Sequence, residues 1–187
     1  MVRAAALAES DPALLARIVA GDLEALGGLF ERYHHDVRRF LLRMGVHSEL
    51  DDLVQLCFLE VIGAARNYDG RASARGWLLA IAATMVRRQR RSIGRMTARL
   101  REWMSSHDQA REELPSETLE GRQAEARLFQ ALQKLSPKKR EVFVMVALEG
   151  TSGEEAAAAL GIPLNTIWTR LHHARKELRR KLGEALP

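Results

Sequence analysis

Arginine side chains dominate the middle of the chain. Nine arginines fall between residues 71 and 101, and this segment contains no Asp or Glu. Guanidinium groups gathered in this way can bind the phosphates of nucleic acid, although a basic run also fits a solvated helix face. The whole chain has a formal net charge of +5, which suits a phosphate-bearing partner without requiring one. Charge therefore indicates anion binding but does not identify the ligand.

A second group of polar and basic side chains lies near the C-terminus. A short helix over 153–160, a turn at 161–163 and a longer helix over 164–182 predict a helix-turn-helix. The apolar residues at 167, 171, 174, 178 and 182 form the inward stripe of the longer helix. An ordinary helical hairpin with a solvated basic face fits the same spacing. If the motif binds DNA, the side chains placed for base edges and phosphates are Asn165, Thr166, Trp168, Thr169, Arg170, His173, Arg175 and Lys176.

No set of side chains has the spacing of a catalytic centre. The sequence offers no glycine-rich phosphate loop and no metal-ligand cluster, and a nucleophile, base and oxyanion donors cannot be assembled from its motifs. His172 and His173 are neighbours that face different sides of a helix, so they cannot share a metal ion. We therefore expect a protein without enzymatic activity, metal or cofactor.

The composition is that of a globular protein. The 187 residues are 47% hydrophobic and 28% charged, which is enough apolar material for a core. The single cysteine, Cys57, excludes a disulfide within the chain and suits a reducing compartment. The longest uncharged apolar run, 76–86, is far shorter than the roughly 20 residues that span a bilayer, and residues 1–8 are too short for a signal peptide. We expect a cytoplasmic protein with no membrane insertion.

Apolar periodicity predicts an all-α fold, because almost no stretch alternates as a half-buried strand would. The expected helices cover residues 12–20, 23–44, 49–66, 74–91, 119–135, 138–148, 153–160 and 164–182. Ser48 and Ser152 each precede an acidic residue by three positions and are predicted N-caps. Pro137 after Ser136 fits the first position of a helix.

The chain is expected to form two small helical domains. From about residue 97 the apolar periodicity fades, the charge turns acidic, and Pro115 would interrupt any helix. We interpret 97–121 as a flexible acidic linker between domains at 1–96 and 122–187. A plain spacer also fits this composition.

Three stretches of the chain resemble a known family. Residues 51–62 read DDLVQLCFLEVI, residues 67–91 read NYDGRASARGWLLAIAATMVRRQRR, and residues 131–178 read ALQKLSPKKREVFVMVALEGTSGEEAAAALGIPLNTIWTRLHHARKEL. In order, spacing and two-module layout they are similar to the extracytoplasmic-function (ECF) sigma factors of bacterial RNA polymerase. The resemblance implies an alternative sigma factor that binds core RNA polymerase and directs promoter-specific transcription initiation, with an anti-sigma factor as a candidate further partner.

The resemblance also implies roles for the two modules and for single residues. The first module is like sigma region 2, which binds core polymerase and reads and melts the minus-ten element. The second is like sigma region 4, whose helix-turn-helix reads the minus-thirty-five element. Polymerase binding falls to Asp51, Asp52, Gln55 and Leu56. Promoter binding in the first module falls to Ser73 and Arg75 in a base-capturing loop over 69–75, to Trp77 beneath that loop, and to Arg87, Arg88, Arg90 and Arg91 along the promoter strand.

Four positions depart from the family pattern: Leu56, Ala74, Thr84 and Trp168. They put a standard promoter sequence in doubt and motivate an alternative function. In that alternative the chain is a divergent sigma-like protein that acts as a stand-alone DNA-binding regulator or a protein-interaction module.

Overall fold

The computed structural model describes residues 9–100 and 119–182, and within these ranges it contains helices and no strand, which confirms the predicted all-α class. The N-terminal part consists of α2 (Asp11–Val19), α3 (Glu24–Arg43), α4 (Leu50–Ala64), the 3-10 helix η1 (Ala65–Asn67) and α5 (Ala74–Leu100). The C-terminal part consists of α6 (Leu119–Gln133), α7 (Pro137–Phe143), the π-helical turn η2 (Val144–Leu148), α8 (Gly153–Leu160) and α9 (Leu164–Leu182).

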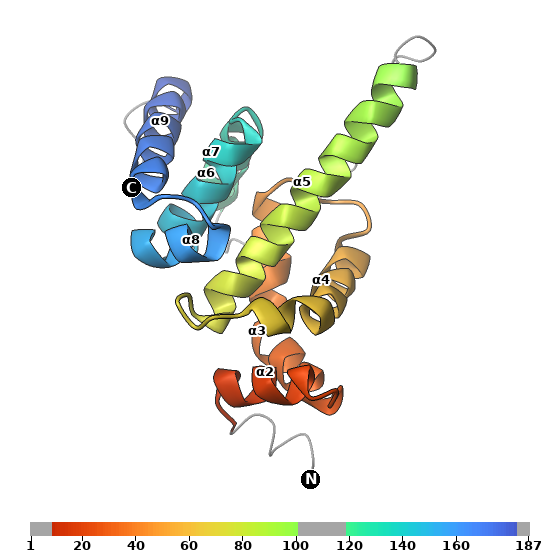
Figure 1. The fold of residues 1–187 in the computed structure, drawn as a ribbon. Helices are drawn as coiled ribbons and strands as arrows, with labels where there is room; N and C mark the ends of the chain where they lie inside the picture. The colour runs from red at the N-terminus through yellow and green to blue at the C-terminus, as the bar shows by residue number, and fades with distance from the viewer. Residues whose placement is uncertain (1–8, 101–118, 183–187) are drawn as a thin grey trace.

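These helices form two lobes. The first lobe is α2 to α5, in which α3, α4 and α5 pack on one another, and the second lobe is α6 to α9, in which α7 and α8 pack on α9. Figure 1 shows the second lobe, in cyan and blue, beside the long helix α5. The lobes touch where α8 packs against α5 and η2 approaches α3. The two predicted helical domains are therefore present.

The predicted helix starts have mixed outcomes. Ser152 is the N-cap of α8, and its hydroxyl accepts a hydrogen bond from the Glu155 amide at 3.1 Å, as predicted. Pro137 is the first residue of α7, also as predicted. The predicted Ser48 cap is wrong. Helix α4 begins at Leu50, because Glu49 adopts a left-handed conformation with φ 56° and serves as N-cap through its backbone alone.

The boundaries of the predicted linker differ from the helix ends. Helix α5 runs to Leu100 and α6 begins at Leu119, so both helices reach into 97–121. Residues 96–100 (MTARL) contain neither proline nor glycine, so nothing in the sequence stops the helix there. The predicted linker residues 101–118 lie outside the described residues.

A buried arginine joins the two lobes at the C-terminus of α3. Arg140 of α7 is 2% exposed and donates to the carbonyls of Gln133 at 2.6 Å and Met44 at 2.8 Å. Arg90 of α5 also donates to the Met44 carbonyl, at 2.6 Å. Met44 caps α3, so two guanidinium groups lie at the negative end of that helix. Burial lowers the pKa of Arg140 to about 10, which leaves it charged at neutral pH.

Candidate polymerase and nucleic-acid interfaces

Helix α4 has one face buried in the core and one face exposed to solvent, and the exposed face carries both polar and apolar side chains. Leu53, Val54, Cys57, Phe58 and Val61 face the core. This stripe leaves all the predicted polymerase-binding residues on the outside, namely Asp51, Asp52, Gln55 and Leu56, and Leu56 is 49% exposed.

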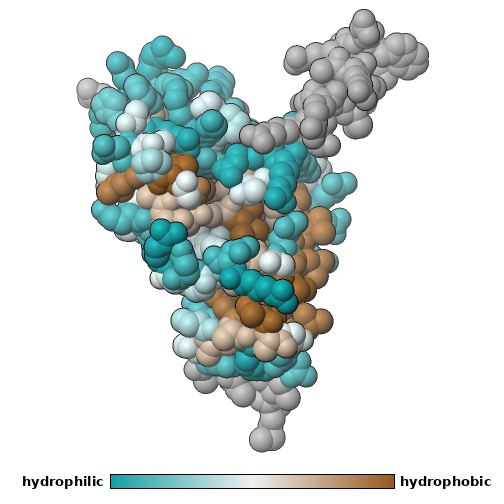
Figure 2. Space-filling view, viewed as in Figure 1, coloured by the Kyte–Doolittle hydropathy of each residue, from teal (hydrophilic) through white to brown (hydrophobic). Residues whose placement is uncertain are grey.

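Sequence reasoning missed two further exposed side chains on α4, Leu59 and Ile62. They are 55% and 37% exposed and follow Leu56 at a spacing of three residues. Figure 2 shows hydrophobic residues gathered on the side of the molecule where α4 lies. An apolar stripe outside the core is a signature of a protein-binding surface. Its signal in the sequence was a second apolar series beside the one that builds the core.

The loop before α5 is held from below by aromatic rings. The Tyr68 hydroxyl donates to the Ala72 carbonyl at 2.7 Å, and the Tyr68 ring meets the Trp77 ring edge-on at 5.2 Å. The Ser73 hydroxyl accepts a hydrogen bond from the Gly76 amide at 3.0 Å, which fixes the start of α5. Ala74, one of the departures from the family pattern, is buried. The structure thus brings Trp77 against Tyr68, whose hydroxyl is bonded to the predicted base-capturing loop at Ala72.

The predicted promoter-binding arginines of α5 do not all face solvent. Arg88 points outward with a side chain 66% exposed and lies 3.7 Å from Glu60. Arg87 pairs with Glu141 of the second lobe, and Arg75 pairs with Glu149 at 2.7 Å. Arg90 points inward to the Met44 carbonyl, and its burial lowers its pKa. The side chain of Arg91 lies outside the part that the structure describes.

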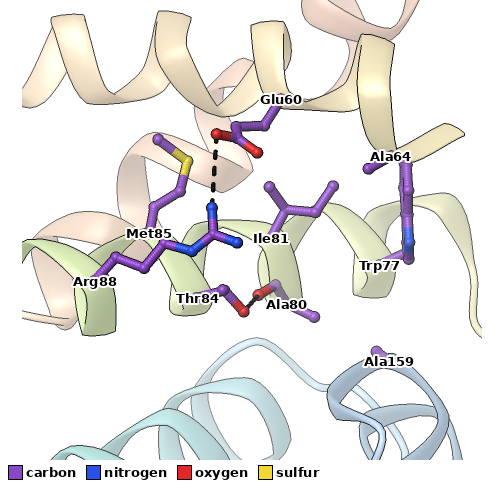
Figure 3. Close-up of a pocket in the computed structure, with 9 residues that line it drawn as sticks. All are labelled: Glu60, Ala64, Trp77, Ala80, Ile81, Thr84, Met85, Arg88 and Ala159. Carbon is purple, nitrogen blue, oxygen red and sulfur yellow. Dashed lines mark hydrogen bonds and ion pairs between the residues drawn. The ribbon is translucent and has the colours of Figure 1, made fainter.

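A pocket of about 190 Å³ lies along α5 between α4 and α8. Figure 3 shows Glu60 and Ala64 from α4 on one side and Ala159 from α8 on the other, with Trp77, Ile81 and Thr84 among the α5 residues between them. The Thr84 hydroxyl donates to the Ala80 carbonyl at 3.0 Å, so this departure from the family pattern bonds within its own helix.

Helix α9 presents its predicted DNA-binding face to solvent. Ile167, Leu171, Ala174 and Leu178 are buried as predicted, and Gly161 ends α8 in the left-handed conformation that a helix-turn-helix needs. The exposed residues are Asn165, Trp168, Thr169, His173, Arg175 and Lys176, while Thr166 and Arg170 are half-buried.

Two members of the α9 set contact their own lobe. Arg170 lies 3.3 Å from Glu141, the carboxylate that also pairs with Arg87, and burial raises the pKa of Glu141 against the opposing effect of Arg87. Trp168 lies over Gly153, the first residue of α8, so closely that a Cβ there would come within 2.5 Å of the indole ring.

Neither a metal cluster nor a membrane span is found in residues 9–100 and 119–182. No three His, Cys, Asp or Glu side chains in those ranges are arranged to hold a metal ion. No helix among the same residues combines the length and the apolar character needed to cross a bilayer.

Both lobes match known protein families. The family described as Sigma-70 region 2 matches residues 29–96, and the family described as Sigma-70, region 4 matches residues 125–178. The ECF RNA polymerase sigma factor SigC of Mycobacterium tuberculosis is 33% identical over 189 aligned positions, which cover 96% of this chain and 93% of SigC. The RNA polymerase sigma factor CarQ of Myxococcus xanthus is 33% identical over 165 positions, covering 88% of this chain and 92% of CarQ.

Solved structures share the fold. CnrH, solved in complex with the cytosolic domain of CnrY, is 26% identical with a TM-score of 0.66 and matches 95% of this chain and 100% of CnrH. The sigma factor RpoE, solved in complex with the anti-sigma factor NepR from Bartonella quintana, is 23% identical with a TM-score of 0.69 and matches 84% of this chain and 96% of RpoE. With these relatives covering both lobes, the chain belongs to the ECF sigma factors of RNA polymerase, as the resemblance predicted.

Proposed function

We propose that this sigma factor binds core RNA polymerase through the outer face of α4 and contacts promoter DNA through the loop 68–73, the arginines of α5 and helix α9. The observation that carries the proposal is that relatives named as RNA polymerase sigma factors match both lobes, over 96% of the chain in the case of SigC. The chain itself performs no chemistry in this account, and phosphoryl transfer is left to the polymerase. A stand-alone DNA-binding regulator would need only a DNA-binding lobe, whereas relatives named as sigma factors match both lobes, so the comparisons favour the sigma factor.

The outer face of α4 has the composition of a protein-binding surface. Exposed Leu56 and Leu59 supply apolar area, while Asp52 and Gln55 supply polar groups beside them. A central apolar patch with a polar rim is typical of stable interfaces. This supports α4 as the polymerase-binding element.

The promoter contacts are proposed on each lobe separately. In the first lobe, Ser73 and the Tyr68–Trp77 ring pair provide a polar group and aromatic surface, which suit an unstacked base. In the second lobe, Asn165 and Thr169 lie exposed on the first turns of α9, where a recognition helix meets base edges. Arg175 and Lys176, further along α9, are exposed for phosphates.

An anti-sigma factor is proposed as a third partner. CnrH and RpoE were each solved with a bound protein, the cytosolic domain of CnrY and the anti-sigma factor NepR. The similarity of this chain to both supports a comparable inhibitor.

The polymerase interface is tested with the double variant Asp52→Asn, Gln55→Ala. Both side chains are exposed, so the fold should persist while the affinity for core polymerase falls about tenfold or more. The matched control is Glu24→Gln, Gln130→Ala, which makes the same kinds of change at exposed positions elsewhere. Affinity is measured by fluorescence anisotropy of labelled full-length protein titrated with core enzyme. Equal affinities for the two double variants would show that the interface lies elsewhere.

A further inference from the structure

Three arginines of the first lobe surround one carboxylate of the second. The Glu149 side chain is 0% exposed and lies 3.0 Å from Arg39, 2.6 Å from Arg43 and 2.7 Å from Arg75. Arg39 and Arg43 lie one turn apart on α3, and Arg75 lies on the first turn of α5. Among the described contacts, the Glu149 side chain bonds to no group of its own lobe.

The arginine cluster is not neutralised from within the first lobe. Asp36 of α3 pairs with Arg39 and, at 3.2 Å, with Arg75. One carboxylate against three guanidinium groups leaves two positive charges, and Glu149 removes one of these only while the lobes touch. The guanidinium groups repel one another, which raises the free energy of the cluster. An anion bound between them lowers that repulsion, so the cluster favours an anion at the position of Glu149.

The cluster adjoins the residues proposed to meet the promoter strand. Arg75 belongs to both groups, and Ser73 lies two residues before it. In this structure acidic side chains of the second lobe also occupy those neighbours. Glu155 accepts a hydrogen bond from the Ser73 amide at 3.0 Å and contacts its hydroxyl, while Glu141 pairs with Arg87. Carboxylates therefore stand at three successive points where DNA would place phosphates or a base.

We propose that Arg39, Arg43 and Arg75 form a binding site for a backbone phosphate of promoter DNA, and that Glu149 occupies this site whenever the lobes are closed without DNA. The inference rests on the proposed function, because it assigns a new contact and a built-in competitor to the same DNA-binding surface. Opening of the lobes withdraws Glu149 and exposes the site. DNA and the Glu149 carboxylate then compete for the same arginines, so a change that weakens the Glu149 contact should raise the affinity for DNA.

The test uses the full-length chain and a short fluorescein-labelled single-stranded DNA of mixed sequence, since phosphate contacts carry no sequence information. Anisotropy gives the dissociation constant between about 50 and 200 mM salt. Glu149→Gln should bind DNA about tenfold more tightly than the wild type, because the neutral amide competes poorly for the arginines. Circular dichroism melting of each variant verifies that both lobes remain folded.

Removal of the α3 arginines identifies the site. Adding Arg39→Gln and Arg43→Gln to Glu149→Gln should weaken DNA binding and reduce the slope of log affinity against log salt by up to about 0.7, the contribution of one phosphate contact on a single strand. Arg38→Gln in the same background is the matched control, because Arg38 lies on the same helix but pairs with Asp51 at 3.3 Å. Its salt slope should match that of Glu149→Gln.

Two results would overturn the inference. One is an unchanged affinity and salt slope in the variant that lacks Arg39 and Arg43. The other is a DNA affinity of Glu149→Gln equal to that of the wild type. Absence of DNA binding by every variant would also overturn the inference, because Glu149→Gln should expose the phosphate site, whereas the proposed function is tested separately by binding to core polymerase. DNA binding that ignores Arg39, Arg43 and Glu149 would contradict this inference alone.

Discussion

The contact between Trp168 and Gly153 leads to a prediction about the packing of the recognition helix. An ideal Cβ at Gly153 would lie 2.5 Å from Cζ2 and 2.7 Å from Cη2 of the Trp168 ring, closer than carbon atoms approach in folded proteins. Gly153→Ala must therefore push the indole away from the first turn of α8. In Trp168→Ala the ring atoms that overlap this methyl group are absent. The effect of the added methyl group on the unfolding free energy should therefore differ between the wild type and Trp168→Ala.

The magnitudes follow from burial and overlap. Trp168 is 45% exposed, so Trp168→Ala should cost about 2 kcal/mol of unfolding free energy, roughly half the cost of a fully buried tryptophan. Overlap should make Gly153→Ala cost about 1 to 2 kcal/mol, because the ring is at the surface and can move. Replacing a helical glycine with alanine also raises the unfolding free energy by up to about 1 kcal/mol, because alanine loses less backbone entropy on folding. Hence Gly153→Ala should destabilise the wild type slightly and stabilise Trp168→Ala, with a coupling of about 1 to 2 kcal/mol.

The assay is a double-mutant cycle with urea unfolding followed by circular dichroism. The four proteins are the wild type, the two single variants and the double variant. A coupling below about 0.5 kcal/mol would refute the reasoning, since that is the range of additive, independent sites. It would mean that the indole does not rest on α8 in solution and is available to another partner.

Four further outcomes are expected. Ser152→Ala should lower the unfolding free energy by about 1 kcal/mol through loss of the α8 cap, and no loss in urea titrations would contradict the cap. Arg140→Lys should cost about 2 to 4 kcal/mol, because an ammonium cannot reach the Gln133 and Met44 carbonyls in a fork; a melting temperature equal to the wild type would contradict this. Burial raises the pKa of Glu141 above its ordinary 4.5, so its stabilising contribution is complete below that pH and is lost as pH rises through the raised value. The stability of wild type relative to Glu141→Gln should therefore fall as the pH rises above the ordinary value of 4.5, and a rise in relative stability would reverse the assignment. Cys57 is fully buried with its pKa raised to about 12, so a thiol reagent should modify it only on unfolding, and rapid modification of the native protein would show an accessible site.

Much of the fold could be predicted because it depends on local periodicity. The stripe of Ile167, Leu171, Ala174 and Leu178 and the turn at Gly161 define α9 and its partner without long-range information. The exposure of the predicted polymerase-binding residues on α4 follows from the same logic, since the positions between core residues must face outward. Local sequence was insufficient at Ser48, where the backbone of Glu49 caps the helix instead.

The contacts between lobes could not be predicted from the sequence. Arg39 and Glu149 are 110 residues apart, and nothing in the pattern of charges shows which acid meets which arginine. Arg170 illustrates the same limit, because a position typical of a phosphate contact lies beside Glu141 in this structure. Periodicity places a side chain on a face of its helix, whereas its partner is decided by packing between segments distant in sequence.

The central claim is that the chain directs core RNA polymerase to specific promoters. The most direct measurement is transcription in vitro from genomic DNA by core enzyme with and without the purified chain, followed by mapping of the transcript 5′ ends. The account predicts new, discrete start sites that appear only with the chain and share sequence elements at fixed spacing upstream. Identical start sites with and without the chain would contradict it.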